Sequence, residues 1–135
     1  MPERPLYPIS FFRTNNLEQT RAFYEGILQL PLALEQSGCV IYLIGKYGYW
    51  GFCQTYEEIL KPEQICLTLV VETRKQVDDW HSYLHEKEVT IKREPQYTEQ
   101  YKIYNGFYND PNGYTLEIQA FDKEGKPKGH DGFKN

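Results

Sequence analysis

Two features that would direct the chain to membranes or nucleic acids are missing from the sequence. A membrane-spanning helix needs about 20 consecutive, mostly apolar residues, and no run of that length occurs. Nucleic-acid binding needs clustered Lys and Arg that neutralise phosphates. The formal net charge is −4, and the Lys-rich stretch 123–128 is short and mixed in sign. We therefore expect neither a membrane nor a nucleic acid as partner.

Cysteine is scarce as well. Cys39, Cys53 and Cys66 are odd in number, and no two of them have CxxC spacing. Disulfide frameworks of small secreted proteins use even numbers of cysteines. The count argues against a disulfide framework and predicts a cytoplasmic location, where thiols stay reduced. Residues 1–5 contain no apolar signal-peptide core, which agrees with that location.

Aromatic residues, by contrast, are plentiful. They make up 16% of the 135 residues, and 12 of them are Tyr. The hydrophobic share of 40% and the charged share of 25% are ordinary for one globular domain. Tyr combines a large apolar area with a hydroxyl that needs a partner. The excess of Tyr fits an aromatic-walled cavity or a subunit interface, and equally an aromatic-rich core.

The apolar pattern predicts the same series of elements twice. A strand at 7–14 is followed by a helix at 17–28, for which Asn16 is the N-cap. A second strand at 65–71 is followed by a helix that begins after Glu72-Thr73 and runs to about Glu86. Turn residues separate the remaining segments, which alternate as strands do. These further strands are expected at 32–36, 40–44, 49–54, 89–93, 101–108 and 115–121.

This order, βαβββ twice, indicates an internal repeat. A shift of 57 residues places Phe23 on Trp80, and a shift of 65 places residues 50–54 on 115–119. We predict an α+β fold in which two βαβββ repeats form a curved mixed sheet around a concave cleft. The predicted domain is 1–121, with a flexible tail at 122–135. Repeat one covers 7–54 and repeat two covers 65–121.

Strand residues alternate between faces, and this assigns a lining to the cleft. Leu67, Leu69, Leu116 and Ile118 form the more apolar sets and are expected to pack on a helix. The residues that alternate with these four, and their equivalents in the first repeat, are expected on the opposite face of the sheet, toward the cleft. A mostly apolar pocket with a few polar groups is the usual form of a small-molecule site. The predicted lining is Ile9, Phe11, Arg13, Trp50, Phe52, Gln54, Cys66, Thr68, Glu117 and Gln119.

Two segments resemble a known family. Residues 16–24, NLEQTRAFY, resemble the "DLExxxxFY" helix start of the vicinal-oxygen-chelate superfamily. Residues 108–117, YNDPNGYTLE, resemble its "F-x-DPxGxxxE" ending. The superfamily includes glyoxalase I, bleomycin-resistance proteins, fosfomycin-resistance enzymes and extradiol dioxygenases. The resemblance spans residues 7–121 and implies a glyoxalase/bleomycin-resistance-like fold.

The resemblance also implies where a metal would bind. Metal-dependent members take four ligands, commonly His, Glu, His and Glu, from four strands. The corresponding positions here are Ile9, Phe52, Cys66 and Glu117. Hydrocarbon side chains cannot bind a cation, and catalytic metals usually have three protein ligands. We therefore expect no metal and no cofactor, although Gln54 would enter this set if the register differed by two residues.

The polar candidates each have two interpretations. Glu117 is either a general base or ligand anchor, or a structural carboxylate satisfied by Arg13, a Tyr hydroxyl or water. Arg13 could hold a substrate carboxylate or lie in solvent at the rim. An apolar strand makes Cys66 a buried, inert thiol rather than a reactive one. His81 and His85 stand four apart on a helix, as metal ligands can, but without a third ligand we expect solvated surface side chains.

Three functions remain in competition. The first is a metal-independent protein that binds an aromatic or hydrophobic small molecule, similar to the antibiotic-sequestering members of the superfamily. The second is a lyase, isomerase or dioxygenase of the same superfamily that uses Glu117 as base or metal ligand. The third is a non-catalytic protein-interaction domain. The resemblance also implies a homodimer.

Overall fold

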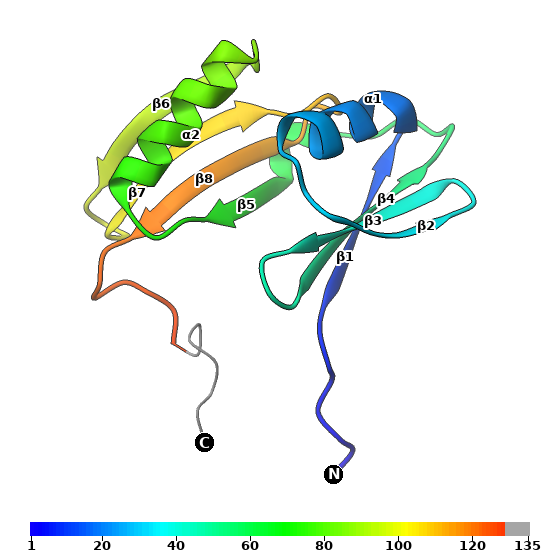
Figure 1. Ribbon diagram of the computed structural model, residues 1–135, viewed down its shortest axis with the longest axis horizontal. Coiled ribbons are helices and arrows are strands. Elements are labelled where there is room, and N and C mark those ends of the chain that lie inside the picture. Colours follow the sequence, from blue (N-terminus) through cyan, green and yellow to red (C-terminus); the bar gives the residue numbers. More distant parts are fainter. Residues whose placement is uncertain (129–135) are drawn as a thin grey trace. The chain divides into compact units, whose positions relative to one another are not determined.

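The computed structural model describes residues 1–128, and the chain forms two compact units (Figure 1). Unit 1 comprises Met1–Pro62 with the turn Asp110–Gly113, and unit 2 comprises Glu63–Asn109 with the chain from Tyr114 onward. Each unit is built on its own four-stranded mixed sheet. The expected α+β fold with the order βαβββ twice is therefore confirmed. In residues 1–128, no helix is both long enough and apolar enough to cross a membrane.

The sheet of unit 1 has the strand order β1-β4-β3-β2. Its parallel pair is β1 with β4, and the other neighbours are antiparallel. The side chain of Asn16 accepts a hydrogen bond from the Gln19 N–H, so the predicted N-cap is confirmed. The predicted helix at 17–28 is present but changes from α to π geometry after its first turn. The elements are β1 (Ile9–Thr14), α1 (Leu17–Arg21), η1 (Ala22–Ile27), β2 (Leu32–Gln36), β3 (Cys39–Ile44) and β4 (Gly48–Gln54).

An aromatic core joins this sheet to its helix. The rings of Tyr24 and Phe52 stack with their centroids 4.4 Å apart, and Phe12 stacks on Phe52 at 5.4 Å. Tyr24, Tyr42 and Phe52 are completely buried. The Tyr42 hydroxyl donates a 2.7 Å hydrogen bond to Glu25, which satisfies its polar end. Much of the aromatic content of the first repeat is therefore core.

Unit 2 repeats the topology with the strand order β5-β8-β7-β6. The helix α2 begins with a complete capping box, in which Thr73 and Gln76 bond to each other's backbone N–H groups. Leu84 and Val77 of α2 are buried, as are Leu67, Leu116 and Ile118 of the sheet, which the alternation had assigned to the helix side. The elements are η2 (Pro62–Gln64), β5 (Cys66–Val70), α2 (Arg74–Glu86), β6 (Ile91–Thr98), β7 (Ile103–Asn109) and β8 (Thr115–Phe121).

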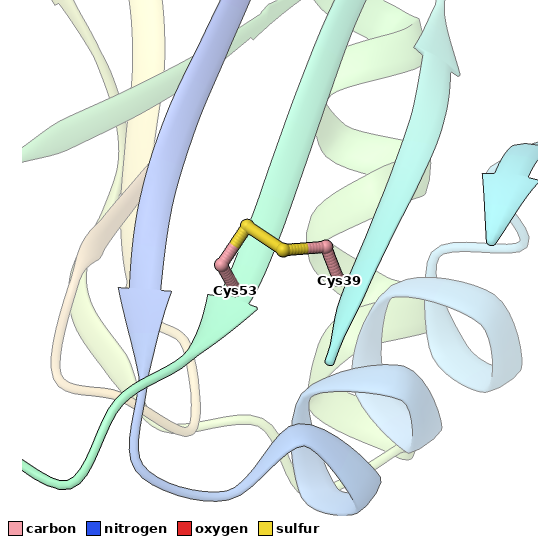
Figure 2. The surroundings of a disulfide bond; sticks show 2 residues. All are labelled: Cys39 and Cys53. Carbon is pink, nitrogen blue, oxygen red and sulfur yellow. A yellow bond between two sulfur atoms is a disulfide. The ribbon is translucent and has the colours of Figure 1, made fainter. Parts of the chain in front are cut away.

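One prediction about cysteine is wrong. Cys39 and Cys53 lie directly opposite each other on the antiparallel strands β3 and β4, and they form a disulfide (Figure 2). Their Cα atoms are 4.2 Å apart, a spacing that cross-strand pairing imposes. The count of three could not reveal this, because one unpaired cysteine, Cys66, makes the total odd.

The C-terminal segment begins with side-chain and backbone contacts inside unit 2. Asp122 accepts hydrogen bonds from Arg74 at 3.0 Å and from the Tyr97 hydroxyl at 2.9 Å. The backbone N–H of Asp122 donates to the carbonyl of Lys102, and that of Gly125 donates to the carbonyl of Asp122. The remainder of the tail predicted at 122–135, from residue 129 on, lies outside the described residues.

Candidate functional site

A buried carboxylate, Glu117, is the centre of a polar network on one face of the unit 2 sheet. The residue is only 8% exposed. Its Oε1 accepts a 2.7 Å hydrogen bond from the Thr68 hydroxyl. Its Oε2 accepts hydrogen bonds from the side-chain amides of Asn105 at 2.7 Å and Gln119 at 2.6 Å. Both carboxylate oxygens are thus satisfied by side chains, as a buried charge requires.

Strand register places these groups together. Thr68 pairs with Glu117 between β5 and β8, and Asn105 pairs with Gln119 between β7 and β8. Paired residues point to the same side of a sheet, and positions two apart along a strand do so too. All four side chains therefore lie on the face opposite the one that carries Leu116 and Ile118.

The network continues outward through an arginine. The Asn105 amide oxygen accepts a 2.6 Å hydrogen bond from Arg93 of β6. The Arg93 guanidinium lies 4.7 Å from the centre of the Phe107 ring, close enough for a cation–π interaction. Phe107 is itself paired with Glu117. A cation, an aromatic ring and a carboxylate thus follow one another across the face.

Cys66 lies at the start of the same face and differs from its prediction. The residue is exposed rather than buried. Its sulfur lies 3.6 Å from the Thr68 hydroxyl and 3.8 Å from Glu117 Oε1. Partial shielding of the sulfur from water raises the pKa of the thiol, and the Glu117 charge adds to this, so the thiol stays protonated at neutral pH. The expectation of an unreactive thiol rests on this pKa rather than on burial.

The residues predicted for the first repeat divide between the two faces of the unit 1 sheet. Ile9, Phe11 and Arg13 lie on the face opposite the aromatic core, and the Arg13 guanidinium forms a 3.0 Å ion pair with Glu57. The prediction that Trp50, Phe52 and Gln54 share this face is wrong. Phe52 is part of the buried core, and Trp50 and Gln54 lie on the same side of β4.

A register error of one residue explains this correction. The predicted shift of 65 matched Phe52 to Glu117. In the sheets, Thr68 pairs with Glu117, and its repeat equivalent Phe11 pairs with Gly51. Gly51 is therefore the residue equivalent to Glu117. Because side chains alternate, an error of one residue transfers every assignment on the strand to the opposite face.

Gln54 has a structural role that the sequence did not indicate. Its side-chain oxygen accepts a 3.0 Å hydrogen bond from the Leu17 N–H at the start of α1. Its amide nitrogen donates to the backbone carbonyls of Asn15 and Thr55 at 2.8 and 3.1 Å. The side chain is therefore fully engaged in holding the beginning of the helix.

The turn motif at 110–113 is likewise structural. Asp110 accepts a 2.8 Å hydrogen bond from the buried Tyr24 hydroxyl and another of 2.8 Å from the Asn112 N–H. The Asn112 side-chain oxygen accepts a 2.6 Å hydrogen bond from Thr14, whose hydroxyl also lies 2.8 Å from that of Thr20. These contacts fix the turn against β1 and α1 within unit 1.

His81 is also more integrated than predicted. Its Nδ1 lies 2.8 Å from the hydroxyl of the completely buried Tyr108, and its side chain is only 19% exposed. The expected solvated surface histidine is therefore wrong for His81. Burial raises the pKa of Tyr108 to about 12, so its hydroxyl remains protonated and available for this hydrogen bond.

The donor set does not fit the metal of the metal-dependent relatives. With the corrected register the four positions hold Ile9, Gly51, Cys66 and Glu117, of which two have no donor atom. Glu117 already accepts hydrogen bonds on both oxygens. Within residues 1–128, no group of three or more His, Cys, Asp or Glu side chains is arranged to hold a metal ion.

Asn105 was not predicted from the sequence, and neither were Arg93 and Phe107 beside it. A signal for it existed, because Asn105 is a short polar residue between apolar ones in 103–108. It is 3% exposed, so an amide at this place needs buried partners. Pairing β7 with β8 would have identified Glu117 and Gln119 as those partners.

Comparison with known proteins agrees with this architecture. The sequence model of the glyoxalase/bleomycin resistance protein/dioxygenase superfamily matches residues 9–118, and the chain belongs to this superfamily. No curated protein sequence matches the chain. Among solved structures, the chain is similar to a glyoxalase/bleomycin resistance protein/dioxygenase from Nocardioides (16% identity, 94% and 90% of the two chains covered, TM-score 0.76).

Two further solved structures have the same fold. One is an integron cassette protein from the mobile metagenome of the Halifax Harbour sewage outfall (22% identity, 88% and 100% covered, TM-score 0.75). The other is a lactoylglutathione lyase from Agrobacterium tumefaciens (15% identity, 88% and 95% covered, TM-score 0.71). At these identities the likeness concerns the fold.

Proposed function

We propose that the chain binds an aromatic or hydrophobic small molecule, without a metal, at the face of the unit 2 sheet that carries Glu117. The observation that carries the proposal is the Glu117 carboxylate, buried and held by Thr68, Asn105 and Gln119. Polar groups buried together stabilise a fold no better than hydrocarbons of the same shape. Such a network at a strand centre is therefore better explained by recognition than by stability.

The same face also supplies the apolar and open part that a ligand needs. Phe107 and Arg93 are only half-buried, and Cys66 is exposed. A flat ligand could stack on the Phe107 ring while a donor group approaches the Glu117 network. Small-molecule sites typically combine apolar walls with a few fixed polar groups.

The chemistry of the donors supports independence from a metal. The positions that supply four ligands in metal-dependent relatives supply here one carboxylate and one thiol whose pKa is raised. A metal ligand must be deprotonated, so the protonated Cys66 thiol is a poor one. The names of solved superfamily structures include a lyase and a dioxygenase. An enzyme of this kind that uses Glu117 as base therefore stays an alternative prediction. Glu117 can act as a base only if a substrate displaces its hydrogen-bond donors.

The test is a screen of planar aromatic fragments by two-dimensional amide NMR on the full chain. We expect at least one fragment to shift the amide signals of Thr68, Asn105 and Gln119. Glu117→Gln should lower the affinity for that fragment by about tenfold or more, because a hydrogen bond to a charged group contributes about 1.5–3 kcal/mol. Glu86→Gln, at the end of α2, is the control with the same charge change. Shifts confined to other regions, or equal affinity in both variants, would contradict the proposal.

Two further parts of the proposal concern assembly and location. The predicted homodimer and the cytoplasmic location rest on the family resemblance and on the sequence. The Cys39–Cys53 disulfide weakens the argument for a reducing compartment, because structural disulfides persist in oxidising ones. Sedimentation of the purified chain tests the dimer, and thiol trapping in lysed cells tests the redox state.

A further inference from the structure

A cavity of about 590 Å³ opens at the end of the unit 2 sheet where β5 and β8 finish. Figure 1 shows these paired strands ending beside each other, with the loop to α2 and the C-terminal segment (orange to red) leaving from the same end. Small-molecule pockets typically measure about 300–1,000 Å³. None of the ten residues predicted from the sequence lines this cavity.

The floor of the cavity is apolar. It is formed by Val70 at the end of β5, Val71 directly after it, Phe121 at the end of β8, and Pro127. Val70 is 55% exposed, so this apolar side chain is open to solvent. Covering such a surface with an apolar group would release its hydration and stabilise the complex.

Two lysines supply positive charge at the same place. Lys123 and Lys126 line the cavity, and within residues 1–128 neither takes part in an ion pair or hydrogen bond. Their neighbours differ, since Arg74 pairs with Asp122 at 3.0 Å and Lys102 lies 4.0 Å from Glu124. The two ammonium groups at the cavity are therefore available to an incoming anion.

The remaining polar groups leave the balance positive. Glu72 is the one acidic side chain that lines the cavity within the described residues, against two lysines. The side-chain oxygen of Gln76 accepts hydrogen bonds from the backbone N–H groups of Glu72 and Thr73, so it is occupied by the helix cap. An apolar floor with a net positive lining is complementary to a molecule that has an apolar body and an anionic end.

We infer that this cavity binds an organic anion, a carboxylate with a short hydrocarbon or aromatic body, between the apolar floor and Lys123 and Lys126. None of the residues that hold Glu117 lines the cavity, although Val70 is paired with Gln119 on the same sheet face. The inference does not depend on the role of Glu117. Binding should weaken as salt rises, because exposed charges are screened.

The test uses octanoate as probe, with octan-1-ol and octylammonium as uncharged and cationic comparators of the same length. On titration, octanoate should shift the amide signals of Val70, Phe121 and Lys123. The double variant Lys123→Gln/Lys126→Gln should bind octanoate about fivefold more weakly, since two exposed ion pairs contribute about 1 kcal/mol together. The control Lys46→Gln/Lys61→Gln makes the same charge change in unit 1 and should bind within about twofold of the native chain.

Three results would overturn the inference. They are equal affinity for octanoate in the two double variants, octylammonium binding as tightly as octanoate, and octanoate shifts centred on Asn105 and Glu117 instead of Val70 and Phe121. Glu117→Gln should leave octanoate binding unchanged, so failure at this cavity and failure at the Glu117 face are distinguishable. Well-dispersed amide spectra of each variant show that it is folded.

Discussion

The two units have the same strand order, and yet the sheet faces opposite their helices carry different chemistry. In unit 2, the centre of this face holds a carboxylate and two amides that donate to it. In unit 1, the equivalent positions hold a glycine and a disulfide. The three matched positions are Glu117, Asn105 and Gln119 in unit 2, and Gly51, Cys39 and Cys53 in unit 1.

The helix-facing sides, by contrast, are alike. Tyr42 and Tyr108 are equivalent, both are completely buried, and each hydroxyl bonds to a helix side chain, Glu25 or His81. The fold therefore constrains the side of the sheet that packs on the helix and leaves the other side free to vary. The two repeats therefore differ at the face where the ligand site is proposed. In unit 1 the Phe11 ring lies over the equivalent position, because a Cβ atom added at Gly51 would be 2.7 Å from that ring.

The largest expected effect comes from the helix-facing side of unit 1. Phe52→Ala removes a buried ring that stacks on Tyr24 and Phe12. We expect a loss of about 3–5 kcal/mol in the free energy of unfolding, measured by denaturant titration. Phe11→Ala, on the opposite face and 60% exposed, should cost less than about 1 kcal/mol. A larger cost at Phe11 than at Phe52 would show that the two faces are assigned the wrong way round.

Loss of the disulfide is expected to have the next largest effect on the free energy of unfolding. Cys39→Ser/Cys53→Ser should lower the free energy of unfolding by about 2–3 kcal/mol. The reason is that the disulfide closes a loop and so reduces the chain entropy of the unfolded state by about that amount. Under denaturing, non-reducing conditions the native chain should show one reactive thiol, that of Cys66. Cys66→Ser serves as the control and should leave stability nearly unchanged. Three reactive thiols in freshly isolated protein would contradict the pairing.

The amide network of unit 2 should be sensitive to a single deletion. Asn105→Ala removes a donor to Glu117 and the acceptor of Arg93. We expect destabilisation by about 1–3 kcal/mol, since a buried polar group is left with fewer partners. Asn109→Ala, on the same strand, is the matched comparison. Equal small losses in both would mean that the network contributes nothing to folding.

The smallest effect is electrostatic and lies in unit 1. The Arg21 hydrogen bond holds the pKa of Glu25 below its usual value of 4.5, and the Tyr42 hydroxyl adds to this. A lowered pKa stabilises the fold above the unfolded-state value, and this stability is lost as pH falls through the folded-state pKa. Arg21→Gln should therefore reduce the difference in unfolding free energy between about pH 6 and about pH 3, by less than about 1 kcal/mol for a partly exposed pair. An unchanged difference would show that the Arg21–Glu25 ion pair does not contribute to the pH dependence of stability.

The sequence predicted the order of the elements well because they depend on local patterns, whereas β6 (Ile91–Thr98) runs well beyond the strand expected at 89–93. The apolar spacing, with the caps at Asn16 and Thr73, placed the two helices. The alternation in β5 and β8 placed Leu67 and Ile118 on the helix side. The faces of β4 were inverted because two repeats of low identity can be matched one residue apart with equal plausibility. Periodicity alone cannot resolve that difference, whereas the pairing of Phe11 with Gly51 does.

The candidate site was predictable only in part. Thr68, Glu117 and Gln119 were identified, because they alternate with apolar residues on two strands that the repeat places side by side. Asn105 required the pairing of β7 with β8, a contact between distant parts of the chain. The Cys39–Cys53 disulfide required the same kind of information. Long-range pairing is therefore the physical quantity that the sequence reasoning lacked.

The central claim is that the Glu117 site works without a metal, and metal analysis tests it most directly. The dialysed native chain and Glu117→Gln would be offered Zn²⁺, Fe²⁺, Mn²⁺ and Ni²⁺ in turn, with bound metal measured by elemental analysis and the Tm recorded. We expect far less than one metal per chain and an unchanged Tm for both proteins. One tightly bound metal per native chain that is lost in Glu117→Gln would contradict the account and make a metal-dependent enzyme the leading interpretation.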